Sequence, residues 1–99
     1  MSGDEHLYIV TYDIADDRRW RRVFKLMHGY GEWLQLSVFQ CRLTRVRHAE
    51  LANRLGSTIA HAEDHVLIVD LGAAEQVTPR VSSLGKRPFA AVERAPVIV

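Results

Sequence analysis

The alternation of strand-like and helix-like hydrophobic patterns constrains this fold more than any other feature of the sequence. Residues 7–12 are all good β formers and predict a first strand, with Asp13 at its C-terminal end. Asp16 or Asp17 would cap the helix that follows. The helix would present one apolar stripe, made by Trp20, Val23, Phe24 and Met27. Gly29 and Gly31 would end it.

The remaining two thirds of the chain repeat this alternation less regularly. Residues 33–43 are β-like, but their apolar phase slips between Val38 and Phe39, which predicts a bulge or a break into two strands. Thr44 would cap a second helix whose apolar positions are Leu51, Leu55 and Ile59. A strand over 66–71, a turn at 83–85 and a short edge strand over 96–99 complete the expected order.

This order, β-α-β(β)-α-β-β, is typical of an α+β fold in which two helices cover one face of an antiparallel sheet, the ferredoxin-like βαββαβ sandwich. A chain of 99 residues forms one domain, here spanning 1–99. We expect residues 1–6 to be disordered. We expect 90–99 to form a C-terminal strand segment that pairs at a sheet edge, in its own subunit or in another.

Composition excludes several classes of protein. The only cysteine, Cys41, allows neither an intrachain disulfide nor a multi-cysteine zinc site. No apolar run approaches the ~18–20 residues of a membrane span, and the polar N-terminus does not resemble a signal peptide. We therefore expect a cytoplasmic protein without a membrane partner.

The net charge of +1 conceals a basic middle segment. Residues 14–54 carry nine bases and four acids. Four of these bases fall within about one 100° sector of the first helix, opposite its apolar stripe: Arg18, Arg21, Arg22 and Lys25. Because no acid lies at i+4, this face is suited to grip a phosphate backbone, and the alternative is a solvated helix face. A second group at a strand end comprises Arg42, Arg45 and Arg47.

Asp13 is the leading candidate for chemistry. A carboxylate at a strand end can hold Mg²⁺, which takes only one or two ligands from protein and keeps water and phosphate. Two copies facing each other across a dimer axis would make a fuller site, whereas the alternative is an Asp that shapes a turn. The run His61, Glu63, Asp64 and His65 is interpreted as a solvated loop rather than a metal site.

Four further residues with polar side-chain groups are interpreted as core. Ser37 and Cys41 would be nucleophiles in principle, but no histidine is adjacent in sequence. Tyr8 and Tyr12 share a strand face with Val10 and would stack on RNA bases only if exposed. We predict that all of these side chains pack in the interior.

Three segments carry a resemblance to a known family: YIVTYDIADDRR (8–19), GYGEWLQLSVFQCRL (29–43) and SLGKRPF (83–89). They resemble the small CRISPR-associated endonuclease of the adaptation complex, the "Cas two" family. Residues 44–71 match only in pattern. The resemblance implies a ferredoxin-like fold, a tight homodimer and a C-terminal strand that pairs with the sheet of the other subunit.

The resemblance also implies a function in antiviral defense. Such a dimer bridges copies of the CRISPR integrase ("Cas one") and holds double-stranded protospacer DNA during spacer acquisition. Family members are described as Mg²⁺-dependent nucleases on RNA or DNA, with Mn²⁺ as a substitute, and Asp13 matches the family's metal ligand. The nucleic-acid-binding candidates are Arg18, Arg19, Arg22, Lys25, Arg42 and Arg45.

Three hypotheses follow for the activity. In the first, Asp13 of both subunits holds Mg²⁺ and the protein is a catalytic endonuclease. In the second, it is a non-catalytic DNA-binding adaptor, and cleavage and joining belong to the integrase. In the third, it is a toxin-like messenger-RNA interferase of the VapD type, which shares the fold. We take the adaptor role as the cellular function and the nuclease activity as one that exists beside it.

Overall fold

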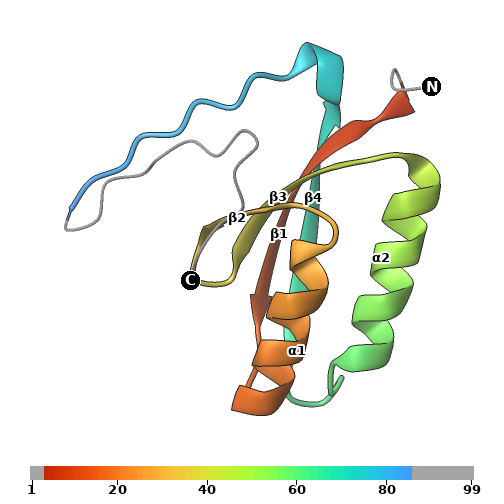
Figure 1. The fold of residues 1–99 in the computed structure, drawn as a ribbon, viewed down its shortest axis with the longest axis vertical. Helices are drawn as coiled ribbons and strands as arrows, with labels where there is room; N and C mark the ends of the chain where they lie inside the picture. The colour runs from red at the N-terminus through yellow and green to blue at the C-terminus, as the bar shows by residue number, and fades with distance from the viewer. Residues whose placement is uncertain (1–3, 86–99) are drawn as a thin grey trace.

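Four antiparallel strands form one sheet, and two helices cover one of its faces (Figure 1). The computed structural model describes residues 4–85. The strand order is β2-β3-β1-β4, as in a ferredoxin-like βαββαβ sandwich. The elements are β1 (His6–Asp13), α1 (Asp17–His28), β2 (Glu32–Gln35), β3 (Val38–Leu43), α2 (Arg45–Thr58), β4 (His65–Ala73) and a 3₁₀ turn (Ala74–Gln76). The predicted fold class is confirmed.

The core lies between the helices and the two central strands. Alternate residues of β1 point toward the helices, which confirms that Tyr8, Val10 and Tyr12 are buried. Across the β1–β3 ladder, Tyr8 pairs with Cys41 and Val10 with Phe39, so these side chains share the same face. The buried residues that complete this layer are Leu43, Val23, Met27, Leu51 and Leu55.

Side-chain caps fix the start of both helices, as the sequence predicts. The Asp16 carboxylate accepts a hydrogen bond from the backbone N–H of Arg19 at 2.9 Å. The Thr44 hydroxyl accepts one from the backbone N–H of Arg47 at 3.2 Å. Each cap satisfies a backbone donor that has no partner within its helix. Helix α1 ends before Gly29, whose N–H donates back to the Leu26 carbonyl at 3.0 Å.

The predicted break in the second β segment occurs two residues earlier than the hydrophobic phase indicates. A turn at Leu36 and Ser37 separates β2 from β3, and Leu36 has a positive φ of 40° and is 72% exposed. The Trp33 indole N–H donates to the Leu36 carbonyl at 2.9 Å and holds this turn. Because the bond is made to the backbone of Leu36, the turn does not depend on the Leu36 side chain. An apolar residue at this position therefore gives no sign of a turn in the sequence.

Order at the N-terminus begins earlier than expected. His6 is the first residue of β1, and the carbonyl of Glu5 accepts a hydrogen bond from the Ala74 N–H at 2.8 Å. The prediction of disorder is therefore wrong for His6, which the sheet holds. The expected strand segment at 90–99 lies outside the described residues. Within 4–85, neither helix has the length and apolar character needed to cross a membrane.

The sheet face opposite the helices, here called the open face, is apolar along β4. Since Val66 and Ile68 pack against the core, the alternating residues Leu67, Val69 and Leu71 turn the other way. They are 50%, 44% and 40% exposed, respectively. The β1–β4 register places Leu67 opposite Thr11 and Val69 opposite Ile9. The part of the chain that the structure describes thus leaves an apolar strip uncovered.

Candidate functional site

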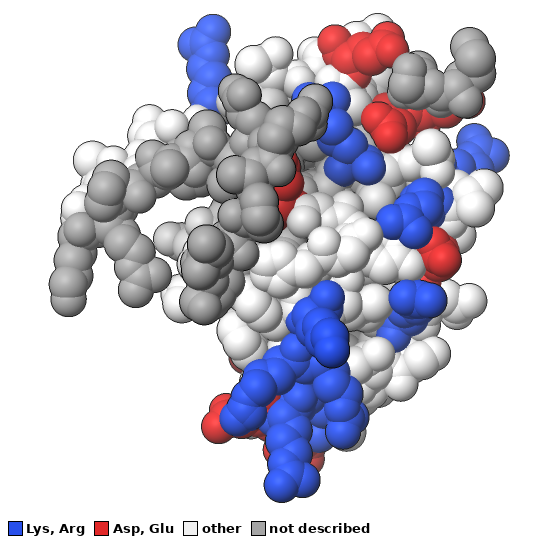
Figure 2. Space-filling model, in the orientation of Figure 1, with Lys and Arg blue, Asp and Glu red and all other residues white. Residues whose placement is uncertain are grey.

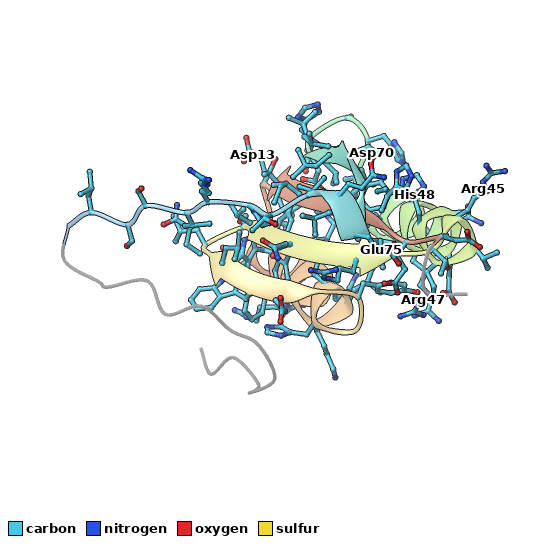
Figure 3. The ribbon with its side chains drawn as sticks, turned by 90° about the horizontal axis from the view of Figure 1, so that it is seen from above. Asp13, Arg45, Arg47, His48, Asp70 and Glu75 are labelled. Atoms are coloured by element: carbon cyan, nitrogen blue, oxygen red, sulfur yellow. The ribbon has the colours of Figure 1, made fainter. Side chains whose placement is uncertain are left out.

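Asp13 ends β1 on the open face. It is exposed, and strand alternation turns its side chain away from the helices, as Figure 3 shows. Across the β1–β4 ladder its partner position is His65. Within residues 4–85 its carboxylate makes no hydrogen bond or ion pair. The carboxylate is therefore free to take a ligand from solvent.

Asp13 offers one carboxylate ligand of the kind that Mg²⁺ prefers. A carboxylate supplies the hard oxygen that Mg²⁺ prefers, and one or two such ligands suffice when water and phosphate complete the shell. No group of three or more His, Cys, Asp or Glu side chains in residues 4–85 is arranged to hold a metal ion. One chain therefore offers a single carboxylate at this end of β1, and further ligands would come from a second copy or from substrate.

Asp64 holds the loop that follows Asp13. Its side chain is fully buried and accepts hydrogen bonds from the backbone N–H groups of Ala15, at 2.9 Å, and Ala60, at 2.8 Å. Arg19 Nε donates to the same carboxylate at 2.8 Å. These contacts, led by the bond from Arg19, hold the pKa of Asp64 well below its usual range.

The contacts of Asp64 correct two sequence-based predictions. The run from His61 to His65 is not simply a solvated loop, because its Asp64 is a buried junction between three segments. Arg19 also donates from Nη2 to Glu63 at 2.9 Å, and its bonds to the two acids raise its pKa. With these donors engaged, we withdraw Arg19 from the phosphate-contact residues and assign it a structural role.

The remaining bases of α1 form an exposed surface, here called the basic face, which comprises Arg18, Arg21, Arg22 and Lys25. None of their side chains makes a hydrogen bond or ion pair with another described residue. Figure 2 shows Lys and Arg side chains gathered over α1. The sequence correctly predicts that α1 exposes this face. Asp16 lies near Arg18 and interacts with its charge, but none of the four cations forms an ion pair with a described residue.

The second predicted basic group does not form one cluster. Arg42 lies on the exposed side of β3, whereas Arg45 begins α2 beside a cavity. Arg47 donates to Glu50 at 2.9 Å and to the Gly29 carbonyl at 3.0 Å, and it lies 4.2 Å from the Tyr30 ring centroid. Arg42 and Arg45 therefore remain candidates for phosphate contact, while Arg47 ties α2 to the end of α1.

The cavity beside Arg45 was missed by the sequence reasoning. It measures about 750 Å³ and is lined by Asp4, His6, Tyr8, Arg45, His48 and Asp70. These residues come from three segments that are far apart in the sequence, so no local pattern brings them together. The available signal was the first turn of α2, which contains bases and no acid.

The predicted core assignment holds for Cys41 but not for Ser37, which is only half-buried in the turn between β2 and β3. Burial raises the pKa of the Cys41 thiol to about 12, so it is not a nucleophile at neutral pH. The Ser37 hydroxyl accepts a hydrogen bond from the Trp20 indole N–H at 2.8 Å. Neither residue contacts a histidine that would activate it.

Comparisons with known proteins agree with this geometry. The family model described as CRISPR associated protein Cas2 matches residues 6–78. A CRISPR-associated endoribonuclease Cas2 from Geobacter sulfurreducens is 61% identical, covering 96% of this chain and 99% of the relative. A CRISPR-associated endoribonuclease Cas2 1 from Rhodospirillum rubrum is 55% identical, covering 99% and 95%.

Solved structures show the same fold. The structure of Streptococcus pyogenes Cas2 at pH 6.5 matches with a TM-score of 0.70 at 32% identity, covering 80% of this chain and 99% of that chain. A hypothetical protein, TT1823, from Thermus thermophilus matches with a TM-score of 0.70 at 34% identity, covering 85% and 95%. The solved structures cover 85% and 80% of this chain, and the family model, which matches residues 6–78, includes β1 and both helices.

Proposed function

The chain belongs to the CRISPR associated protein Cas2 family, and on this basis we propose that it acts in spacer acquisition as a homodimer that holds double-stranded DNA. The observation that carries this proposal is the basic face of α1, whose four cations form no ion pair and no side-chain hydrogen bond with the described residues. Bridging of the CRISPR integrase is proposed from the family resemblance.

The dimensions of the basic face suit a phosphate backbone. From Arg18 to Lys25 the helix rises about 10 Å, since each residue adds about 1.5 Å. Phosphates of one DNA strand advance about 3.4 Å along the axis per nucleotide, so the face spans about three of them. These contacts would carry no base information, which suits a protein that must accept protospacers of any sequence.

The open face supports the homodimer. A solvent-exposed strip of Leu67, Val69 and Leu71 costs free energy in water, and a second copy of the same strip would cover it. Each Asp13 lies on the open face of its own sheet. Packing two open faces together would therefore place the Asp13 residues of both chains on the side where the two sheets meet. The dimer would carry two basic faces, which would extend the DNA-binding surface.

A nuclease activity is the second candidate function, and the free Asp13 carboxylate favours it. Relatives named endoribonucleases support this activity, with RNA or DNA as substrate. Asp13 from each chain would hold Mg²⁺, or Mn²⁺ in its place; when bound, the ion would activate water and neutralise charge on the phosphodiester. The family match favours this CRISPR role over the toxin-like interferase of the VapD type.

DNA binding is tested by neutralising half of the basic face. Each phosphate contact contributes about 0.9 to the slope of log K against log salt, so Arg18→Gln with Arg22→Gln should lower that slope by about 1.8 for each basic face of the dimer that contacts the duplex. Fluorescence anisotropy of a labelled duplex at a series of salt concentrations measures it. Arg54→Gln, an exposed arginine on α2, is the matched control. An unchanged slope in the double variant would remove the basic face from the proposal.

Cleavage is tested with Asp13→Asn. Wild type and variant, purified as the same oligomer, are incubated with labelled RNA and duplex DNA in the presence of Mg²⁺, Mn²⁺ or a chelator. We expect metal-dependent products from the wild type alone. Equal cleavage by both proteins, or none by either, would reject Asp13 as a catalytic residue and leave the adaptor role.

A further inference from the structure

The polar cavity beside Arg45 lies at the opposite end of β1 from Asp13. It measures about 750 Å³ and is formed by the start of β1, the first turn of α2 and the end of β4. Figure 3 shows Arg45, His48 and Asp70 on this side of the molecule, away from Asp13. The neighbouring residues that complete the lining are Asp4, His6 and Tyr8.

The helix beside this cavity begins with the wrong charge for its dipole. The first turn of α2 contains Arg45 and Arg47 and no acid. The N-terminus of a helix carries a partial positive charge, so cations there are disfavoured and an anion is stabilised. Arg47 is paired with Glu50, whereas the guanidinium of Arg45 has no hydrogen bond within residues 4–85. An anion at this end of α2 would compensate both the helix and Arg45.

Tyr8 points independently to a ligand. The residue is only 6% exposed and lines the cavity, yet its hydroxyl has no hydrogen-bond partner among the described residues. The hydroxyl itself is not enclosed, since the Tyr12 hydroxyl is the buried side-chain polar atom without a partner among the described residues. The Tyr8 hydroxyl therefore opens onto the cavity, where a ligand that accepts a hydrogen bond would engage it. The Tyr8 ring stacks on His48 at 4.6 Å between centroids and 6° between planes, which holds both polar groups at the cavity wall.

Two acids line the cavity, Asp4 and Asp70, and Asp70 is already committed to other partners. Asp70 Oδ1 lies 2.9 Å from His6 Nδ1 and accepts the backbone N–H of Gly72 at 2.8 Å. These bonds hold the pKa of Asp70 below its usual range. Its charge is therefore partly balanced, and Arg45, His48 and Tyr8 remain as donors without a protein acceptor.

We propose that this cavity binds a phosphate group of a nucleic-acid strand, with Arg45 as the cation and the Tyr8 hydroxyl and His48 imidazole as hydrogen-bond donors. The proposal rests on nucleic-acid binding by the protein. The phosphate would be either a terminal phosphomonoester or an internal phosphodiester, which share the same recognition chemistry. Either kind of phosphate would place part of the nucleic-acid strand at the end of β1 that is opposite Asp13.

Titration with inorganic phosphate tests the cavity without nucleic acid. In NMR spectra of the ¹⁵N-labelled protein, phosphate should shift the side-chain signals of Arg45 and His48. Tyr8→Phe keeps the ring stack but removes the hydroxyl, and a hydrogen bond to a charged group is worth about tenfold or more in affinity. We expect at least that loss for Tyr8→Phe and for Arg45→Gln, and no loss for Arg54→Gln. Equal affinity in all four proteins would overturn the proposal.

Asp70→Asn should change phosphate affinity in the opposite direction to Tyr8→Phe and Arg45→Gln. Because this carboxylate faces the cavity, its removal should tighten phosphate binding. If Asp70→Asn instead weakens binding, and Mg²⁺ or Zn²⁺ alone shifts the same signals, the cavity is a cation site and the proposal is wrong. Unchanged amide spectra away from the cavity establish that each variant is folded.

Oligonucleotides separate this inference from the proposed function. If the wild type binds no duplex at all, the proposed function fails, while the phosphate titration still decides the cavity. If it binds duplex and Arg45→Gln and Tyr8→Phe bind equally well, the inference fails alone. A preference of the wild type for 5′-phosphorylated over 5′-hydroxyl strands that both variants lose would identify a terminal phosphate. An equal weakening on both strands would identify an internal phosphodiester.

Discussion

The open face makes a quantitative prediction about assembly. Leu67 and Val69 are 50% and 44% exposed, and full burial of such a side chain contributes about 1.5–3 kcal/mol. Covering the exposed halves is therefore worth about 1 kcal/mol for each side chain. In a two-fold symmetric interface each residue counts twice, so the pair supplies about 4 kcal/mol, or about 1,000-fold in the dimer dissociation constant.

Replacing both residues by threonine removes most of this contribution without disturbing the strand. Threonine is a good β former, so Leu67→Thr with Val69→Thr should leave β4 intact. Because threonine keeps one methyl group, we expect the dissociation constant to rise between about 30-fold and 1,000-fold. Sedimentation equilibrium over a range of protein concentrations measures the change, and circular dichroism with urea denaturation checks the fold.

Val46 supplies the control, since it is 76% exposed but lies on α2, away from the open face. Val46→Thr makes the same chemical change and should leave the dissociation constant within a factor of about two. Two results would refute the reasoning. A monomeric wild type at tens of micromolar would mean that a second copy does not cover the strip. A similar shift in both variants would show that exposed apolar surface in general, rather than this face, drives association.

Three further predictions concern the fold that carries the site. The pKa of Asp64 is lowered in the folded protein, so its carboxylate stabilises the fold fully above the pKa of an unfolded carboxyl group. This stabilisation is lost as the pH falls toward the pKa of the folded state. The urea midpoint should therefore change less between pH 2 and 6 in Asp64→Asn than in the wild type. Cys41, with its pKa raised to about 12, should react with a thiol reagent at pH 8 only after unfolding. Gly31→Ala should destabilise the protein in the same denaturation assay, because the new methyl carbon would lie 2.5 Å from the Gln40 carbonyl oxygen.

Local chemistry determined most of what could be predicted. The caps at Asp16 and Thr44, the apolar stripe of α1 and the strand alternation in β1 all depend on residues a few positions apart. These patterns place Asp13 at a strand end and expose the basic face, so both candidate sites follow from the sequence.

Long-range contacts account for what was missed. Arg19 and Asp64 are 45 positions apart, and His6 and Asp70 are 64 apart. Nothing near Arg19 distinguishes it from Arg18, yet one is held by a buried carboxylate and the other faces solvent. Such pairs arise from the way the sheet brings β4 beside β1, and they decide which cations remain free for a ligand.

The turn between β2 and β3 is a position at which a single substitution should increase the thermal stability of the protein. Leu36 adopts a left-handed φ that favours glycine and asparagine, and with 72% of its surface exposed it has few contacts to lose. A strained residue of this kind costs about 1–2 kcal/mol, so Leu36→Asn should raise the melting temperature by several degrees. Asp13 and the basic face would be untouched by this change, and the stabilised background would tolerate the variants that probe them.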